Sequence, residues 1–277
     1  MTDEIIKVRN SVIQYGKENN RVYLMKLSKS DCSYILKYVN NLALEEGLTK
    51  IFAKVPTSLQ GDFFNDGYIQ EAFVKKFFKG EENCHFLCKY FSSDRQEFYD
   101  KEEIEKIKKI CFEKERDFQP LKLDGKFSIK QLAKNHAVKM TKIYKTIFKS
   151  YPFPIFDPGY IKKTMAENID YFGAFCGNSL VAVSSCEMDL ENLNSEMTDF
   201  AVLPEYRGHN IAYYLLQSME AAAKSKGIKT FYTIARAKSA GMNITFAKSN
   251  YTYSGALVNN TNISGSIETM NVWYKNI

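Results

Sequence analysis

The segment between residues 202 and 212 holds the residues best suited to bind a small anion. It reads Val-Leu-Pro-Glu-Tyr-Arg-Gly-His-Asn-Ile-Ala and joins a predicted strand to a predicted helix. A tight turn of this kind leaves backbone N–H groups exposed at the positive end of the helix dipole. Together with the guanidinium of Arg207, these donors suit a diphosphate. A solvated turn with a solvent-facing arginine is the alternative, and the turn alone does not separate the two.

A second segment, with Cys84, His85 and Cys88, contains residue types that bind metals. No second Cys/His pair lies nearby in the sequence, which argues against a zinc site. The spacing instead predicts a strand with both cysteines on one face. We therefore predict buried, reduced thiols and no metal.

The composition indicates a globular protein, because 45% of the 277 residues are hydrophobic and 25% are charged. The net charge of +6 is mild and the lysines are spread along the chain, which argues against nucleic-acid binding but allows a small anionic ligand. The first residues, 1–4, lack the basic and apolar regions of a signal peptide, and the apolar runs are too short to cross a bilayer. We expect a cytoplasmic protein that does not bind a membrane.

Hydrophobic periodicity after residue 120 predicts the order β-α-α-β-β-β-α-β-α-β-β. The predicted strands cover 126–131, 171–176, 180–188, 196–203, 231–235 and 251–257, with a last strand ending at 274. The predicted helices cover 137–147, 159–168, 211–222 and 239–249, and 259–265 is predicted as a polar loop. Antiparallel strands precede one parallel crossover, so we expect a mixed α/β sheet and not a doubly wound one.

A charged amphipathic helix over 101–117 separates this part from the preceding half. Pro120 and the pair Asp124-Gly125 follow as turn signals. The boundary is predicted near residue 120, which gives domains at 1–120 and 121–277.

The strand order and the segment Arg207-Gly208-His209-Asn210-Ile211-Ala212 together resemble the GNAT superfamily of N-acetyltransferases. The pyrophosphate signature of that superfamily is Arg/Gln-x-x-Gly-x-Gly/Ala, and here Arg207 and Ala212 match while Asn210 replaces the middle glycine. Asparagine tolerates positive φ, so the turn is still expected to close. The resemblance implies acetyl-CoA as a co-substrate, with its diphosphate on residues 207–212 and with Asn243 and Phe246 on the helix that contacts acetyl-CoA.

Further segments are similar to β-lysine N-acetyltransferases and extend over nearly the whole chain. They are 242–246, 254–255, 259–263 and 270–275 near the end, and 20–27, 50–56 and 67–72 in the first half. This resemblance implies acetylation of the ε-amine of β-lysine, a product that serves the family as a compatible solute. An acetyltransferase for another amine and a non-catalytic acyl-CoA-binding module are the alternatives. Whether the chain acts as a homodimer stays open.

The resemblance also implies catalytic roles. A lysine-type amine must lose a proton, at a cost of about 4.6 kcal/mol at pH 7, and Glu196 and Asp199 on the strand before the turn are the candidate bases. Each acid can equally be a cap or an edge residue. Backbone N–H groups of Phe200, Ala201 and Val202 are expected to bind the acetyl carbonyl.

Many family members use a tyrosine to protonate the leaving thiolate, and that position here is Phe246. Tyr251, or else Tyr253, is the predicted replacement; water or an unprotonated thiolate are the alternatives. For the acceptor, Arg236 is the predicted carboxylate clamp, and the predicted polar loop offers amides from Asn259, Asn260 and Asn262.

The first half repeats part of this pattern. A strand at 50–55, a helix, and strands at 67–74 and 85–91 echo residues 230–274. Residues 10–100 are therefore either a partial, diverged copy of the same fold, without its pyrophosphate turn, or an unrelated α/β cap.

Overall fold

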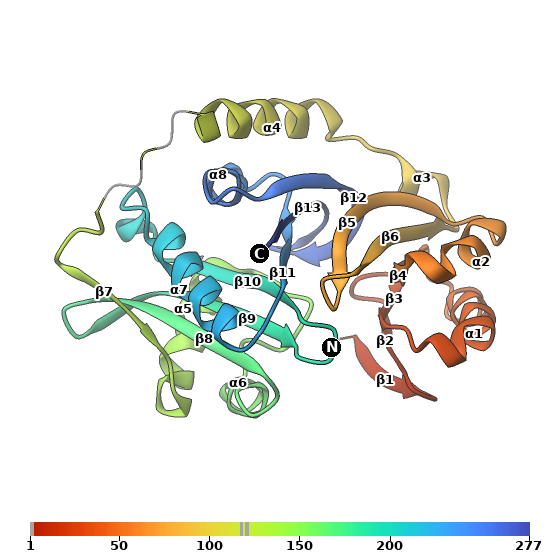
Figure 1. Ribbon diagram of the computed structural model, residues 1–277, viewed down its shortest axis with the longest axis horizontal. Helices are drawn as coiled ribbons and strands as arrows, with labels where there is room; N and C mark the ends of the chain where they lie inside the picture. Colours follow the sequence, from red (N-terminus) through yellow and green to blue (C-terminus); the bar gives the residue numbers. More distant parts are fainter. Residues whose placement is uncertain (1–2, 117–118, 120–121) are drawn as a thin grey trace.

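The computed structural model describes residues 3–116, 119 and 122–277 and folds them into two mixed sheets, one in each half of the chain (Figure 1). In the N-terminal sheet the strand order is β1-β2-β3-β4-β6-β5, and only β3 and β4 pair in parallel. Its strands are β1 (Glu4–Val8), β2 (Ser11–Gly16), β3 (Arg21–Lys26), β4 (Lys50–Pro56), β5 (Ile69–Phe78) and β6 (Glu82–Tyr90). The helices of this half are α1 (Cys32–Glu45), α2 (Gln60–Asn65) and α3 (Ser93–Gln96).

The C-terminal sheet has the order β12-β13-β11-β10-β9-β8-β7, and its one described parallel pair is β10 with β11. Its strands are β7 (Phe127–Gln131), β8 (Ile169–Cys176), β9 (Ser179–Asp189), β10 (Asn194–Val202), β11 (Thr230–Arg236), β12 (Thr252–Ile263) and β13 (Ser266–Asn276). The helices are α4 (Lys101–Arg116), α5 (Ala137–Ile147), α6 (Pro158–Thr164), α7 (Ile211–Ser225) and α8 (Ala240–Lys248). The mixed α/β class is thus confirmed.

The two sheets share one topology. In each, an antiparallel hairpin leads to a strand, a helix and a parallel strand, and two further antiparallel strands complete the sheet with the last strand inserted. The order β2-β3-β4-β6-β5 thus repeats β9-β10-β11-β13-β12, with α1 in the place of α7 and α2 in the place of α8. The topology therefore favours a partial copy of the same fold over an unrelated cap.

The helix start in the N-terminal copy that corresponds to the start of α7 carries an acid. The chain between β3 and α1 is short, and Asp31 stands at the start of α1. Its carboxylate accepts hydrogen bonds from the Asn10 N–H (2.8 Å) and the Ser11 hydroxyl (3.3 Å). A carboxylate at this point repels an anion, so α1 is less suited to a diphosphate than α7.

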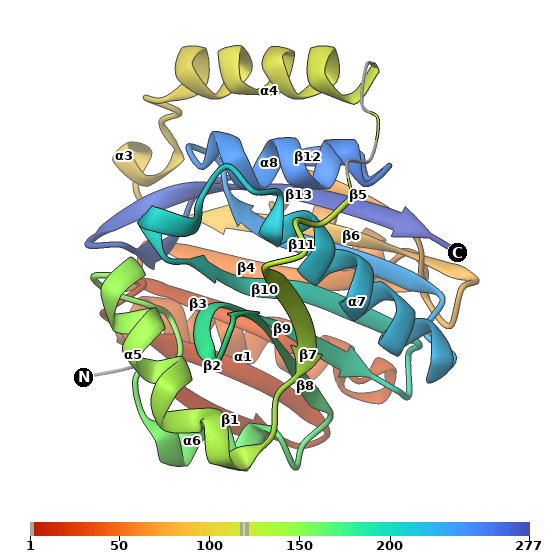
Figure 2. The ribbon, with the colours of Figure 1, turned by 90° about the vertical axis from the view of Figure 1, so that its left-hand side faces the viewer.

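The sheets face each other across a shared core. One buried cluster combines side chains of the N-terminal sheet, such as Phe52 and Phe86, with Tyr144 of α5 and Val272 of β13. A second cluster lies under α7, α8 and α4, and a third under α1 and α2. The layers are therefore helices, sheet, shared core, sheet and helices, and α4 runs across α8 on the outside (Figures 1 and 2).

The structure bears differently on the predicted loop at 259–265 and on the predicted boundary near residue 120. The polar loop predicted at 259–265 is wrong, because β12 continues to Ile263 and the turn is short. The predicted domain boundary at Pro120 lies outside the described residues, so the division at 120 stays a prediction.

Candidate active site

A cleft opens where β10 and β11 separate. The two strands pair from Asn194 to Glu196 against Thr230 to Tyr232, and their register ends there. Beyond that point the β11-facing backbone groups of β10 are available to a ligand. The resulting cleft has a volume of about 1430 Å³ and is lined by both halves of the chain, including β3, β4 and β5 on the N-terminal side.

The start of α7 lies at one end of this cleft. Asn210 precedes the helix with φ 55° and ψ 22°, and Gly208 has φ 85°, so the predicted positive φ at Asn210 is confirmed. The N–H of Tyr214 is the first to bond within the helix, to the Asn210 carbonyl. The amides of residues 211–213 therefore remain as donors at the helix end, as an anion site requires. Arg207 is exposed beside them and donates from Nε to the Val202 carbonyl (3.3 Å).

Asp199 marks an irregularity in β10. The register with β9 shifts between Thr198 and Ala201, and Asp199 adopts φ 55° in the bulge. Its carboxylate is buried and accepts hydrogen bonds from the hydroxyls of Tyr151 and, at 2.6 Å, Ser185. Burial raises the pKa of Asp199 above its ordinary value, although both hydrogen bonds oppose the shift. The bulge thus holds a proton acceptor beside the point where β10 and β11 separate.

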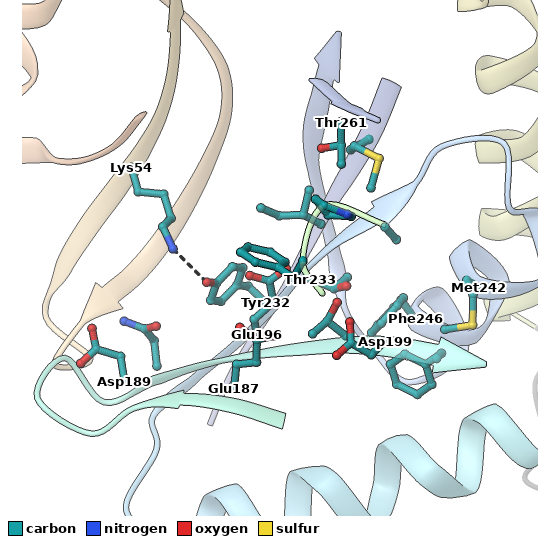
Figure 3. A pocket seen from close by; sticks show the side chains of 18 of the residues that line it. Lys54, Glu187, Asp189, Glu196, Asp199, Tyr232, Thr233, Met242, Phe246 and Thr261 are labelled. Carbon is teal, nitrogen blue, oxygen red and sulfur yellow. Dashed lines mark hydrogen bonds between the residues drawn. The ribbon is translucent and has the colours of Figure 1, made fainter. Parts of the chain in front are cut away.

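Three further ionisable side chains stand next to it (Figure 3). Glu187 of β9, Glu196 of β10 and Tyr232 of β11 occupy directly paired positions and line the cleft. Lys54 reaches across from β4 and donates to the Tyr232 hydroxyl (3.2 Å). With Asp199, five ionisable groups from four strands and from both halves therefore meet on one wall.

The pKa values of the acids reflect this crowding. Burial raises the pKa of Glu187 well above its usual range, and repulsion by Asp199 and Glu196 adds to the shift. Burial also raises the pKa of Glu196, against the opposing effect of Lys54. The wall therefore holds carboxylates that bind a proton more readily than exposed carboxylates do.

Comparisons with known proteins agree with this geometry. Residues 139–243 match the family model described as Acetyltransferase (GNAT) family. A β-lysine N(6)-acetyltransferase of Methanococcus maripaludis is 43% identical over 99% of this chain and 98% of its own length. The chain belongs to the GNAT acetyltransferase family.

Two more relatives support the same family. The N-acetyltransferase YodP of Bacillus subtilis is 32% identical over 85% of each chain. A β-lysine N(6)-acetyltransferase of Methanosarcina mazei is 28% identical over 84% of this chain and 93% of its own length. The similarity to these acetyltransferases thus extends well beyond the matched residues 139–243 into the N-terminal half.

Replacing Asn210 tests the GNAT turn. We expect Asn210→Gly to keep both stability and acetyl-CoA affinity, because glycine adopts positive φ without strain. Asn210→Val should lower the free energy of unfolding by about 1–2 kcal/mol, because a β-branched residue is strained there. Thermal unfolding and an acetyl-CoA titration measure both effects, and a valine variant as stable as the native protein would contradict this conformation.

Replacing Glu187 tests the crowded acids. Its pKa is higher in the folded than in the unfolded chain, so the native protein loses stability as pH rises from about 4 through the raised value. Glu187→Gln should therefore raise the thermal midpoint at neutral pH, by an amount that shrinks toward pH 4. The exposed Glu45 of α1 provides the control, since Glu45→Gln should show no such trend. A stabilisation that is equal at all pH values would contradict the repulsion.

The α8 side of the cleft lacks the predicted tyrosine acid. Phe246 lines the cleft and packs edge-on against Phe200, with 5.7 Å between the rings. Tyr251 is 2% exposed and packs behind Phe246, outside the cleft lining. Tyr253 packs on Trp273, also outside the lining. These positions argue against either tyrosine as the acid.

Asn243 also has a different surrounding from the one expected. Its side-chain N–H groups donate to the carbonyls of Arg236 and Ser239, and its Oδ1 accepts from Asn271 and Trp273. Because it is fully buried, it fixes α8 on the sheet and leaves no group for acetyl-CoA. The side chains of Ala201 and His209 likewise lie outside the cleft lining, so any contact there falls to their backbone.

The residues predicted to bind the acceptor are largely engaged elsewhere. The Nε and Nη2 groups of Arg236 donate to Glu268, at 2.9 and 2.6 Å, so one edge of its guanidinium is occupied. Asn259 donates to the carbonyls of Arg95 and Glu97, and Asn262 donates to that of Glu18. The last two side chains therefore fix β12 to the N-terminal half. Asn260 does line the cleft, and its Oδ1 accepts no hydrogen bond from the described residues.

The residues that sequence reasoning missed come from other elements of the same wall. They are Lys54, Tyr151, Ser185, Glu187 and Tyr232. Residues 50–56, which include Lys54, belong to a segment that resembles the β-lysine acetyltransferases, and this was the available signal. In the described residues no cluster of three or more His, Cys, Asp or Glu could hold a metal, and no helix could span a membrane.

Proposed function

We propose that this chain transfers the acetyl group of acetyl-CoA to the ε-amine of β-lysine. The names and identities of its relatives support the reaction and the acceptor. The observation that carries the proposal is a single cleft that joins an anion-binding helix end to a wall of acids and one lysine. We also propose that the enzyme is cytoplasmic, which fits the free thiols of all six cysteines.

The cleft fits acetyl-CoA in two respects. The amides at the start of α7, with Arg207 beside them, suit the diphosphate. The separated edges of β10 and β11 offer unpaired backbone groups to an extended chain such as pantetheine. In this arrangement the amides of residues 200–202 stabilise the oxyanion formed at the acetyl carbonyl.

Asp199 is the proposed base. It lies one residue before those amides, and its carboxylate is oriented by Tyr151 and Ser185. The ammonium of the acceptor loses one proton to Asp199, and the amine nitrogen then bonds to the thioester carbon. Collapse of the tetrahedral intermediate breaks the carbon–sulfur bond and releases the second proton. One proton ends on the sulfur of coenzyme A and the other in solvent.

Departure of the thiolate needs no side-chain acid in this scheme. Phe246 has no proton to give, and the neighbouring tyrosines lie outside the cleft lining. A thiolate is a weak base and a good leaving group, so it can depart unprotonated and receive its proton from water.

The test is thiol release from acetyl-CoA with β-lysine, α-lysine, spermidine and a lysine peptide supplied separately. We expect a clear preference for β-lysine and a product acetylated at the ε-nitrogen. Preference for spermidine or the peptide would assign another acceptor. Binding of acetyl-CoA without turnover of any amine would leave only a binding module.

A further inference from the structure

We propose that Lys54 of the N-terminal half binds the carboxylate of the acceptor. Glu187 and Glu196 of the C-terminal half bind its second ammonium. The inference rests on the proposed function and assigns the groups that select an amino acid over a polyamine. Its structural basis is that the positive charge of this cleft wall, on Lys54, comes from the N-terminal half, whereas the negative charges, on Glu187 and Glu196, come from the C-terminal half (Figure 3).

Lys54 differs from four other cations that line the cleft. Lys26 pairs with Glu191, Lys29 with Glu82 and Arg236 with Glu268. The Arg21 guanidinium is held by the Asn260 carbonyl at 2.6 Å.

Lys54, by contrast, makes no ion pair within 4 Å with any carboxylate in the described part of the chain. Its ammonium instead contacts the Tyr232 hydroxyl and lies 5.5 Å from the centres of the Tyr23 and Tyr232 rings. A half-buried ammonium in this position favours an anionic partner that enters the cleft.

The two glutamates require the opposite charge. Glu187 and Glu196 stand directly opposite each other on antiparallel strands, and both face the cleft. Like charges in paired positions repel, and a cation between them removes that repulsion. Neither acid forms an ion pair within 4 Å with a described lysine or arginine. Lys54 attracts both acids without forming an ion pair, and the ammonium at the β-carbon of β-lysine would bring a second cation to them.

The spacing fits a substrate that carries its reacting amine at the other end. Asp199 lies three residues beyond Glu196 on β10, at the bulge, and both side chains line the same cleft. An acceptor with its ε-amine at Asp199 can therefore place its carboxylate and second ammonium near Lys54, Glu187 and Glu196. A polyamine has no carboxylate, so it would place either another cation or an uncharged part of its chain next to Lys54.

The experiment compares KM and kcat of the native protein and two variants with three acceptors. Putrescine retains the two amines of β-lysine and lacks its carboxylate arm, and ε-aminocaproate retains the carboxylate and lacks the second amine. We expect Lys54→Met to raise KM for β-lysine and ε-aminocaproate by about 10- to 100-fold, with kcat little changed and KM for putrescine not raised. Glu187→Gln should raise KM for β-lysine and putrescine but not for ε-aminocaproate.

Matched controls separate recognition from folding. Lys26→Met removes a lysine of the same cleft rim that is already paired with Glu191, and it should leave all three KM values unchanged. Lys54→Arg should retain part of the preference for carboxylates. Equal losses with all acceptors, or no change in Lys54→Met, would overturn the inference. A native protein that fails to acetylate β-lysine would instead overturn the proposed function.

Discussion

Replacing Asp199 with asparagine is expected to lower kcat by about 10²- to 10⁴-fold, the usual contribution of a positioned general base. The reason is that asparagine keeps the shape of the side chain but cannot accept the amine proton. Stability should not fall, because burial already disfavours the charged form of Asp199. The amide can still accept from Tyr151 and donate to the Ser185 oxygen. The measurement is steady-state turnover of β-lysine, together with thermal unfolding.

Two companion variants make this result specific. Tyr151→Phe removes a hydrogen bond that lowers the pKa of Asp199, so the acidic limb of the pH–rate profile should move to higher pH. Glu196→Gln should mainly raise KM for β-lysine, since Glu196 faces Glu187 and Lys54. If Asp199→Asn keeps kcat within a few-fold and Glu196→Gln abolishes it, the base is Glu196.

The C-terminal sheet could be predicted closely because its signals are local. Periodicity and turn residues marked the order from β7 to β13, and Gly227, with φ 82°, follows the end of α7 as expected. The conformation of Asn210 followed from the same kind of reasoning, since few residue types tolerate positive φ. Local chemistry therefore predicted the conformation of the turn before α7, which we propose as the diphosphate site.

The acceptor wall could not be predicted in this way because it depends on contacts between distant segments. Asn259 and Asn262 read as a loop, since asparagine is uncommon in strands. Their partners are Arg95, Glu97 and Glu18, more than 160 residues earlier in the chain. Lys54 has the same character, because its position facing Tyr232 exists only once the halves have packed together.

The repeated topology gives this packing a functional meaning. The N-terminal copy has Asp31 where a phosphate would bind, so it is unsuited to a second acetyl-CoA. It instead presents the strand face with Lys54 to the site of the other copy. In our proposal, one copy binds the donor and the other completes the wall for the acceptor.

Cohesion of the two halves should then depend strongly on a buried ion pair. Lys50 of β4 is fully buried and donates to Glu71 of β5 (2.9 Å) and to the Val258 carbonyl of β12 (2.6 Å). We expect Lys50→Met to lower the free energy of unfolding by about 3–5 kcal/mol, because it leaves the Glu71 carboxylate buried without its cation. The thermal midpoint should fall by roughly 6–20 °C, as scanning calorimetry can measure.

This expected loss of unfolding free energy depends on all the contacts of Glu71 and not on Lys50 alone. Glu71 also accepts hydrogen bonds from Tyr90, from Cys88 (2.7 Å) and from the Val258 N–H (3.2 Å), so the carboxylate links β5 and β6 to β12. Lys89→Met is the matched control, since Lys89 pairs with Asp66 on the surface of the same sheet and should cost less than about 1 kcal/mol. The double variant Lys50→Met with Glu71→Leu should recover much of the loss, because no isolated charge remains buried. A single Lys50→Met variant as stable as Lys89→Met would mean that the shared apolar core, without this ion pair, holds the acceptor wall in place.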